Sequence, residues 1–439
     1  MDATTSAAKP PGKRLVVCLD GTWNTPDEKG NPTNVVKILR AVDTRGADGV
    51  PQVSFYDKGV GTGGPLDKLL GGVSGYGLDQ NVLDGYRFLA NNYEGGDESR
   101  APDEIYLFGF SRGAYTARSL AGLVGRFGLL APGNLDVLNQ LWALYRAKGT
   151  REQAAGDLKK AMDEGYPEVS ITCIGVWDTV GALGIPIHSF KPFRKASDKE
   201  FGFHDTELGA RVRCAFHAVA IDEQRGPFEP TLWSIPAGAQ PRAGQVVEQV
   251  WFPGVHSNVG GSYEDAGLSD LALQWMIDRV RKHTRLRFIA SYLEEKVHPN
   301  AMGTLYDSRT TAYLAYQALP YARLIAQRDP GGLGLQSRLH LILHPPAGAS
   351  FLNESLHVSA LTRFGQEAPY KSPGNRTRYE PGTLRAALPA VSAGTLPVVN
   401  DEGEPLPTGE ARALAEQALQ RSPHKPAPKP KPPEIDHGG

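Results

Sequence analysis

Residues 103–124 contain the pattern that most restricts how this chain can fold. Asp103–Phe108 is a short apolar run of strand composition, and the next six residues, Gly109–Ala114 (GFSRGA), fit the motif G-x-S-x-G. Apolar residues then recur at helical spacing. A strand, a glycine-flanked serine and a helix in this order predict a sharp corner, at which the hydroxyl of Ser111 projects from the top of a sheet. We therefore expect Ser111 to be a nucleophile.

Strand-like and helix-like segments alternate around this corner, as a parallel sheet with helical crossovers requires. The other expected strands are Lys13–Leu19, Gln52–Tyr56, Val169–Trp177 and Val246–Phe252. The expected helices are Asn34–Val42, Leu78–Tyr93, two within Leu135–Glu164, and Leu268–His283. The stretch between the last two strands is rich in Gly, Pro and Phe and is interpreted as irregular. The pattern predicts an α/β fold with a mostly parallel sheet flanked by helices.

The size of the chain allows a large core. Its 439 residues, 40% of them hydrophobic, suffice for one large α/β domain with insertions or for two domains. We expect a disordered segment at 1–13, a catalytic domain with inserted cap segments at 14–283, and a cap or C-terminal subdomain at 284–385. Residues 386–439 are interpreted as a loop and a disordered tail, because Pro423–Pro433 is rich in proline and lysine.

Charge and cysteine content exclude several classes of function. The net charge of −1 and the absence of a basic stripe with interleaved aromatic residues disfavour nucleic-acid binding. The three cysteines are widely spaced within apolar runs, which favours buried free thiols over disulfides or a zinc site. The N-terminal segment lacks the apolar core of a secretory signal, and no run is long enough to span a membrane. We expect a cytoplasmic protein, which would need a signal-independent system for export.

Three residues fall into one chemical order. Ser111, Asp178 and His256 each lie just beyond the carboxyl end of an expected strand, in the order serine, acid, histidine that is typical of α/β hydrolases. A serine hydroxyl attacks an ester only when a histidine takes its proton, and a carboxylate must hold the imidazole in the correct tautomer. The sequence therefore predicts a catalytic triad that needs no metal and no organic cofactor.

Each of these residues has a structural alternative. Ser111 could be an ordinary turn serine, and Asp178 could cap a helix that begins beyond it. Among the other histidines, His217 lies in the apolar run RCAFHAVA and is best explained as a core residue. His204, together with Asp205, could form a second polar site on a loop that supports the first.

The first expected strand ends in Asp20-Gly21-Thr22, which suggests a rival enzyme class. Haloacid-dehalogenase-like phosphatases carry D-G-T after a strand, but their nucleophilic aspartate stands two positions earlier, where this chain has Cys18. We expect instead that a backbone N–H of Gly21 or Thr22 joins the N–H of Arg112 in an oxyanion hole. Asp20 would orient this loop or contact Arg112.

Ordered sequence blocks over roughly the first 280 residues resemble a known family. They are LVVCLDGTWN (15–24), TNVVKI (33–38), YDKGVGTG (56–63), GYGLDQNVLDGYRFL (75–89), IYLFGFSRGAYTAR (105–118), GVWDTVGALGIP (175–186), FHDTEL (203–208) and WFPGVHSNVGGSY (251–263). The family comprises α/β-hydrolase domain proteins related to the class 1 lipase effectors of bacterial type VI secretion, with relatives in fungi. The resemblance implies an α/β-hydrolase-like fold with cap insertions and a C-terminal extension. It also implies that Ser111, Asp178 and His256 hydrolyse carboxylic esters. In the effector members of the family these esters are the acyl esters of phospholipids.

Two other functions remain open at this stage. One is an esterase that acts on a soluble ester, and the other is a catalytically silent binding protein on a hydrolase fold, because a fold alone does not establish activity. Labelling with a fluorophosphonate would separate an enzyme from a silent protein. The expected partners are a lipid or other ester substrate, a peripheral membrane surface and, from the resemblance, a secretion machinery.

Overall fold

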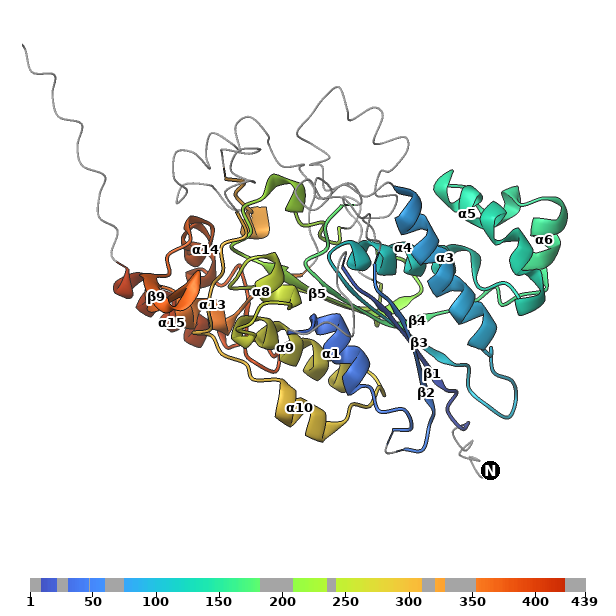
Figure 1. The fold of residues 1–439 in the computed structure, drawn as a ribbon, viewed down its shortest axis with the longest axis horizontal. Helices are drawn as coiled ribbons and strands as arrows, with labels where there is room; N and C mark the ends of the chain where they lie inside the picture. The colour runs from blue at the N-terminus through green and yellow to red at the C-terminus, as the bar shows by residue number, and fades with distance from the viewer. Residues whose placement is uncertain are drawn as a thin grey trace, which may run out of the picture.

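An eight-stranded parallel sheet forms the centre of the molecule (Figure 1). The computed structural model describes residues 9–21, 31–46, 48–59, 75–181, 208–234, 242–309, 320–327 and 353–422. In spatial order the strands are β10, β7, β6, β5, β4, β3, β1 and β2, and every adjacent pair is parallel. Their bounds are β1 Arg14–Leu19, β2 Gln52–Asp57, β3 Glu104–Phe110, β4 Ile171–Trp177, β5 Val212–Ala220, β6 Val246–Phe252, β7 Glu354–His357 and β10 Val398–Val399.

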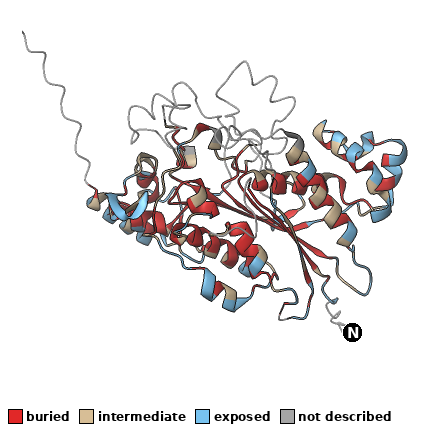
Figure 2. Cartoon of the chain, in the orientation of Figure 1, coloured by how far each residue is buried: buried red, intermediate tan, exposed pale blue. Residues whose placement is uncertain are grey.

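Both faces of the sheet are covered by helices, as the long apolar runs of its strands require. Along β1, Val16 and Cys18 point into one core, whereas Leu15, Val17 and Leu19 point into the other. The first core contains α1 (Asn34–Ala41) and α9 (Gly267–His283), and the second contains α3 (Gly75–Asn92) and α4 (Arg112–Phe127). Figure 2 shows the resulting buried central layer. The prediction of an α/β fold with a helix-flanked parallel sheet is confirmed.

The remaining helices extend these layers. Beside α3 and α4, the second core also contains residues of α5 (Leu138–Arg146) and α6 (Gly156–Asp163), which are the two helices expected within Leu135–Glu164. On the other face lie α8 (His256–Gly260) and α10 (Ala290–Lys296), near α9 and α1 (Figure 1). Short 3-10 helices are η1 Pro132–Val137, η2 Arg151–Gln153, η3 Gly226–Phe228 and η4 Ile325–Gln327. In the described parts of the chain, no helix has the length and apolar content to cross a bilayer.

Strand β5 was not expected from the sequence. It lies between β4 and β6, within the stretch interpreted as irregular, and its residues from Cys214 to Ala220 are buried. His217 lies in its middle, where Nε2 accepts a hydrogen bond from the backbone N–H of Thr179 (3.1 Å) and Nδ1 faces Oε1 of Gln249 (3.3 Å). Burial lowers the pKa of His217 to about 3, so the ring is neutral. The prediction of His217 as a core residue is confirmed.

The three cysteines also behave as predicted. Cys18 and Cys173 are fully buried and Cys214 nearly so, and none of them forms a disulfide. Burial raises the pKa of each thiol, which keeps the three sulfur atoms protonated. Their place is on central strands of the sheet, where they pack as small apolar side chains.

The C-terminal part of the chain completes the same sheet. Strands β7 and β10 extend it beyond β6, and a third core joins Val219 and Trp251 of the preceding strands to the C-terminal helices. Those helices are α13 Val358–Arg363, α14 Gly382–Ser392 and α15 Thr408–Arg421, and the hairpin of β8 (Glu367–Tyr370) and β9 (Ser372–Arg378) lies between the first two. All of them occupy the orange to red end of Figure 1.

The prediction of a loop from residue 386 is therefore wrong for the described residues. Leu388, Val391, Ala411, Ala415 and Ala418 lie on the buried faces of α14 and α15, and this packing outweighs the weak helical signal of the local sequence. The described residues end at 422, so the predicted tail at 423–439 lies outside them, as do residues 1–8, 310–319 and 328–352 of the expected N-terminal and cap segments.

Candidate functional site

Ser111 occupies a strained corner between β3 and α4. Its backbone has φ 59° and ψ −121°, in the left-handed region that L-residues rarely adopt. A Cβ on Gly113 would lie 2.1 Å from the carbonyl oxygen of Leu19, and a Cβ on Gly109 would lie 2.5 Å from the carbonyl oxygen of Gly113. The motif G-x-S-x-G therefore has glycines where backbone segments touch. The N–H of Ser111 donates to the carbonyl of Trp177 (3.1 Å), which fixes the corner against β4.

Asp178 directly follows β4 and is fully buried. Its φ of 40° also lies in the left-handed region, and its N–H donates to the carbonyl of Ala218 on β5 (2.8 Å). His256 is the first residue of α8, four positions beyond the end of β6. Its ring lies between those of Phe110 and Phe228, with centroid distances of 4.6 and 4.8 Å. Two side chains from distant segments thus converge on the corner at Ser111.

The structure brings the three predicted residues into one hydrogen-bonded array. Nε2 of His256 lies 2.8 Å from Oγ of Ser111, and Nδ1 of His256 lies 2.5 Å from Oδ2 of Asp178. Their order along the chain, beyond the ends of β3, β4 and β6, explains the convergence, since the carboxyl ends of parallel strands meet at one edge of a sheet. The imidazole is placed to accept the proton of the hydroxyl while the carboxylate fixes its tautomer.

The electrostatics of the array suit this role. Burial lowers the pKa of His256, although Asp178 opposes the shift, so the imidazole is the neutral base at pH 7. Burial alone would raise the pKa of Asp178, but the positive charge of Arg323 and the contact with His256 outweigh it and hold that pKa well below its ordinary value. The carboxyl group is therefore ionised, as an orienting acceptor must be.

Sequence reasoning missed two residues of this site. Arg323, from the short described segment 320–327, contacts both carboxylate oxygens of Asp178. Glu223, on the loop after β5, accepts the backbone N–H of His256 at Oε2 (3.2 Å) and pairs with Arg225. Arg225 outweighs burial and lowers the pKa of Glu223 to about 2. Neither residue belongs to a recognisable motif, and no local pattern indicates contacts across 145 and 33 positions.

Comparison with known families decides where this array belongs. Residues 13–279 match the model of the family described as T6SS, phospholipase effector Tle1-like, catalytic domain. The chain belongs to this family. The match covers the sheet from β1 to β6, most of both flanking helical layers and all three residues of the array. The predicted family relationship is thereby confirmed, and the chain carries a hydrolase domain of the Tle1-like phospholipase type.

The individual relatives are more distant or only partly matched. The uncharacterized protein YEL023C of Saccharomyces cerevisiae is 30% identical over 244 residues, which cover 50% of this chain and 32% of the yeast protein. A crystal structure of an uncharacterized protein from Pseudomonas aeruginosa is 16% identical with a TM-score of 0.43, covering 94% of this chain and 62% of that one. The Tle1 effector bound to the VgrG spike of the type VI secretion system is 17% identical with a TM-score of 0.33, covering 59% and 53%. The match thus spans about a third of the yeast relative.

The loop after β1 of the Tle1-like domain begins at Asp20, whose side chain is buried. Oδ2 of Asp20 accepts hydrogen bonds from the hydroxyls of Thr33 (2.6 Å) and Tyr56 (2.9 Å), and Oδ1 accepts the N–H of Gly21 (2.7 Å). The carboxylate of Asp20 thus joins the end of β1 to Thr33 and Tyr56, and its role in orienting the loop stays a prediction. The oxyanion donor expected from Gly21 or Thr22 also stays a prediction.

The other predicted site residues have different outcomes. Arg112 is the first residue of α4, where backbone N–H groups have no carbonyl partner within the helix, and burial lowers the pKa of its side chain to about 10. Thr22, His204 and Asp205 lie outside the described residues. Within the described ranges, no group of three or more His, Cys, Asp or Glu side chains is arranged to hold a metal ion.

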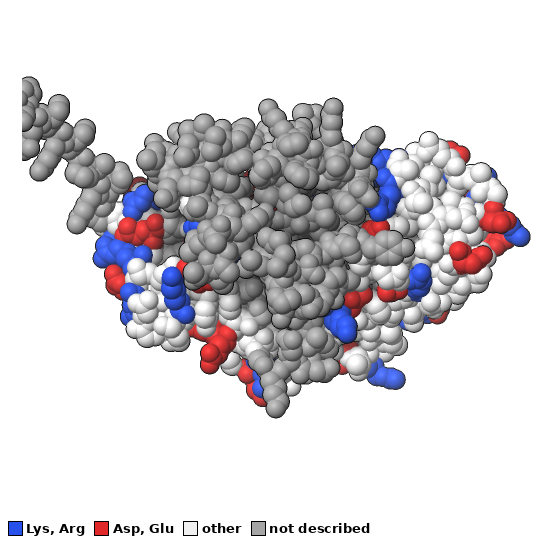
Figure 3. All heavy atoms as spheres, turned by 45° about the horizontal axis from the view of Figure 1, so that its top comes forward, with Lys and Arg blue, Asp and Glu red and all other residues white. Residues whose placement is uncertain are grey.

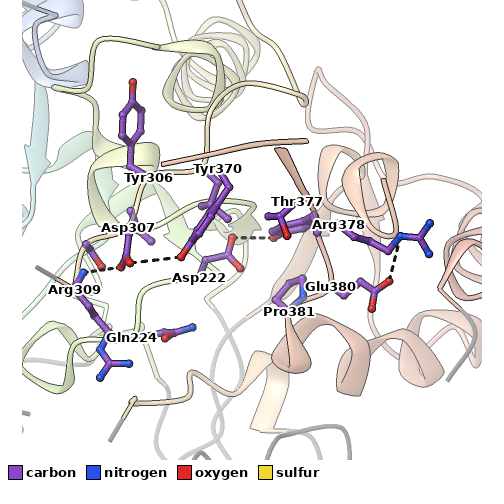
Figure 4. A pocket seen from close by; sticks show the side chains of 14 residues that line it. Asp222, Gln224, Tyr306, Asp307, Arg309, Tyr370, Thr377, Arg378, Glu380 and Pro381 are labelled. Carbon is purple, nitrogen blue, oxygen red and sulfur yellow. Dashed lines mark hydrogen bonds and ion pairs between the residues drawn. The ribbon is translucent and has the colours of Figure 1, made fainter. Parts of the chain in front are cut away.

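A cavity of about 200 Å³ lies between the loop after β5 and the hairpin β8–β9 (Figure 4). Oδ2 of Asp222 accepts the hydroxyl of Tyr379 (2.8 Å), and burial raises the pKa of this carboxyl to about 6. Ser308, also in the wall, donates to Oε1 of Glu223 (2.9 Å). Glu223 also accepts the backbone N–H of His256. Ser308, from the C-terminal part of the Tle1-like chain, therefore contacts a residue that holds the catalytic histidine in place.

Proposed function

We propose that this chain is a serine hydrolase that cleaves the acyl esters of membrane phospholipids through an acyl-enzyme intermediate. The observation that carries the proposal is the buried array in which His256 lies within hydrogen-bond distance of both Ser111 and Asp178. Membership of the Tle1-like phospholipase family supports the choice of a lipid ester over a soluble one. A buried, apolar setting for the imidazole supports a base that is neutral near pH 7.

In the proposed first step, Oγ of Ser111 attacks the ester carbonyl carbon while Nε2 of His256 takes the hydroxyl proton. The carbonyl electron pair moves onto oxygen, which accepts hydrogen bonds from the backbone N–H of Arg112 and from the loop after β1. In this proposal the second donor is a backbone N–H of Gly21 or Thr22. Collapse of the tetrahedral intermediate breaks the bond to the alcohol oxygen, and the imidazolium returns the proton to that alcohol.

The second step repeats the chemistry with water. His256 takes a proton from water, the hydroxide attacks the acyl carbon, and Oγ of Ser111 leaves with the proton that the imidazolium returns. The products from a phospholipid are a fatty acid and a lysophospholipid. Asp178 stays ionised throughout and stabilises each imidazolium.

Delivery of the protein is a second part of the proposal. The family description names an effector of type VI secretion, and the Tle1 effector has been solved bound to a VgrG spike. We propose that this chain is likewise carried from the cytoplasm by a spike complex. Co-purification of the chain with the VgrG spike that binds the Tle1 effector, compared with an unrelated VgrG, tests this part. Equal recovery with both spikes would argue against specific loading.

A vesicle assay on wild type and Ser111→Ala tests the catalytic part. We expect wild type to release fatty acid from phospholipid vesicles faster than from a soluble ester of similar acyl length, and Ser111→Ala to release none. On the described part of the face in Figure 3, basic and acidic side chains are interspersed, so vesicles of neutral and anionic lipid should be compared.

The two alternatives give different results in the same assay. Turnover of soluble esters without fatty-acid release from any vesicle would replace the lipase by a general esterase. The absence of all ester turnover, together with no labelling by a fluorophosphonate, would leave a silent binding protein.

A further inference from the structure

We propose that Arg323, from the C-terminal part of the chain, is a positioning residue that holds the carboxylate of Asp178 in the orientation that faces Nδ1 of His256. The inference rests on the proposed serine hydrolase function and deepens it. Arg323 lies beyond residues 13–279, the part that matches the family model, so the fourth member of the array comes from outside the matched domain. Through Asp178, the C-terminal third of the chain would help to position the catalytic histidine.

The contacts of Arg323 define the position of the carboxylate. Nη1 of Arg323 donates to Oδ1 of Asp178 (2.6 Å), and Nη2 donates to Oδ2 (3.0 Å), so the two planar groups pair side by side. The N–H of Ala220 also donates to Oδ1 (3.0 Å). Oδ2 is left facing Nδ1 of His256 at 2.5 Å. A rotation of the carboxylate away from His256 would break both bonds to the guanidinium.

The guanidinium is itself held in place. Nη1 also donates to the carbonyl of Ala220 (2.7 Å), and Nη2 donates to the carbonyl of Phe228. The neighbouring backbone is tied to the same loop, because the N–H of Tyr321 donates to the carbonyl of Gln224 (2.9 Å). Arg323 has only 1% of its surface exposed. A lysine could supply the charge but not the paired bonds that fix the plane of the carboxylate.

The backbone of Asp178 explains why such a clamp is needed. Its φ of 40° is strained, and a conformation of this kind persists only where its surroundings hold it. Further restraints on Asp178 are the side-chain bonds to His256 and Arg323 and the bond from the N–H of Ala220 to Oδ1. Without Arg323 the buried carboxylate would lose the guanidinium that balances its charge and keep His256 and the N–H of Ala220, and both the strain and the desolvation would favour its withdrawal.

The charged groups around the pair predict a shift in pH dependence. Arg323 and Arg225 are the cations that face Asp178 and His256, Glu223 is the facing anion, and the neutral ring of His217 lies nearby on β5. Loss of the positive charge of Arg323 favours uptake of a proton by the Asp178–His256 pair. The pair then becomes protonated at a higher pH, whichever of the two residues holds the proton.

The test compares Arg323→Gln and Arg323→Lys with wild type, and uses Arg363→Gln as the matched control. Arg363 is equally buried and donates to the carbonyls of Ala301 and Gly303, but it touches no residue of the array. For Arg323→Gln we measure kcat/KM on a soluble ester as a function of pH. We expect the pH at which activity is lost on the acidic side to rise by about 1 unit or more. We also expect kcat to fall on the order of 10- to 100-fold with little change in KM. Arg323→Lys should keep the pH of this acidic loss near its wild-type value but still lose kcat, and Arg363→Gln should change neither.

A second readout does not depend on turnover. NMR of ¹⁵N-histidine-labelled protein, with His256 assigned by substitution, reports the pKa of the ring and the low-field proton on Nδ1. In Arg323→Gln this proton signal should broaden or disappear and the pKa should rise. A folded Arg323→Gln with a wild-type pH profile and an unchanged His256 signal would overturn the inference. If that variant does not fold, an unchanged kcat in Arg323→Lys would overturn it instead. Inactive wild type would refute the proposed function alone, because the NMR comparison still stands.

Discussion

Substitution of Gly113 by alanine tests whether the corner at Ser111 depends on contact between two backbone segments. A Cβ at this position would lie 2.1 Å from the carbonyl oxygen of Leu19 and 2.5 Å from that of Asp20. Ordinary contact begins at 3.4 Å, so α4 and the end of β1 must separate by about 1.3 Å. Both contacts are backbone atoms at the end of a central strand, which cannot rotate aside. We expect the overpacking to cost about 1–3 kcal/mol of the free energy of unfolding.

The same movement carries the reactive groups with it. Ser111 and the N–H of Arg112 begin α4, so a shift of about 1 Å should reduce kcat on the order of 100-fold. Gly125→Ala is the matched control, because it lies on the same helix and, among the described residues, its Cβ would meet only Cβ of Arg211 at 4.0 Å. It should gain about 0.5–1 kcal/mol and keep full turnover. Urea unfolding and ester hydrolysis measure both effects. Wild-type turnover in Gly113→Ala would refute the reasoning.

Three further predictions concern the site and its surroundings. Ser111→Ala and His256→Ala should each lower kcat on the order of 10³-fold or more, and the double variant should fall little further; a further loss as large as the first would contradict a shared step. Arg112→Ala keeps its backbone N–H, so kcat should fall by less than about 10-fold, equally on neutral and anionic lipids; a loss confined to anionic lipids would instead indicate recognition of the head group. His217 binds a proton in the unfolded chain near pH 6.5 but in the folded protein only near pH 3, so the free energy of unfolding should drop by about 1.4 kcal/mol per pH unit below 6.5. In His217→Gln the free energy of unfolding, measured with urea from pH 7 to 5, should fall less steeply with pH. An unchanged slope would mean that other groups cause the pH dependence.

The positions of the three predicted site residues could be derived from the sequence because each follows a strand. The run before Ser111, the run before Asp178 and the run before His256 are all strongly apolar, and each becomes a strand of the sheet. In a parallel sheet their carboxyl ends share one edge, so chain order alone places the three residues near one another. Their hydrogen bonds agree with that expectation.

The C-terminal strands and helices could not be derived in this way. Strand β10 has two residues and β7 has four, which is too short for an alternating pattern to be recognised. Helix α14 contains Pro389, and α15 is rich in alanine and begins after Pro407, so neither resembles a strong amphipathic helix. Their positions are set by packing against Val219 and Trp251, residues about 105 to 200 positions earlier.

The contacts that the side chains of the site make could not be predicted from the sequence either. Asp20 could have contacted Arg112 or its own loop, and only the structure shows that its carboxylate takes the N–H of Gly21. Arg323 is one of many arginines, and nothing in its neighbourhood indicates a contact with Asp178. Both contacts depend on how loops from different strands pack, which local patterns do not record.

Labelling with a fluorophosphonate, followed by mass spectrometry of the peptides, tests the central claim most directly, because an activated serine attacks the phosphorus, displaces fluoride and keeps the phosphonyl group. We predict one adduct per chain, located on the peptide that contains Ser111. We also predict no adduct in Ser111→Ala and much slower labelling in His256→Ala. An enzyme that hydrolyses esters while its adduct lies on another residue, or a Ser111→Ala variant that still labels at the wild-type rate, would contradict this claim.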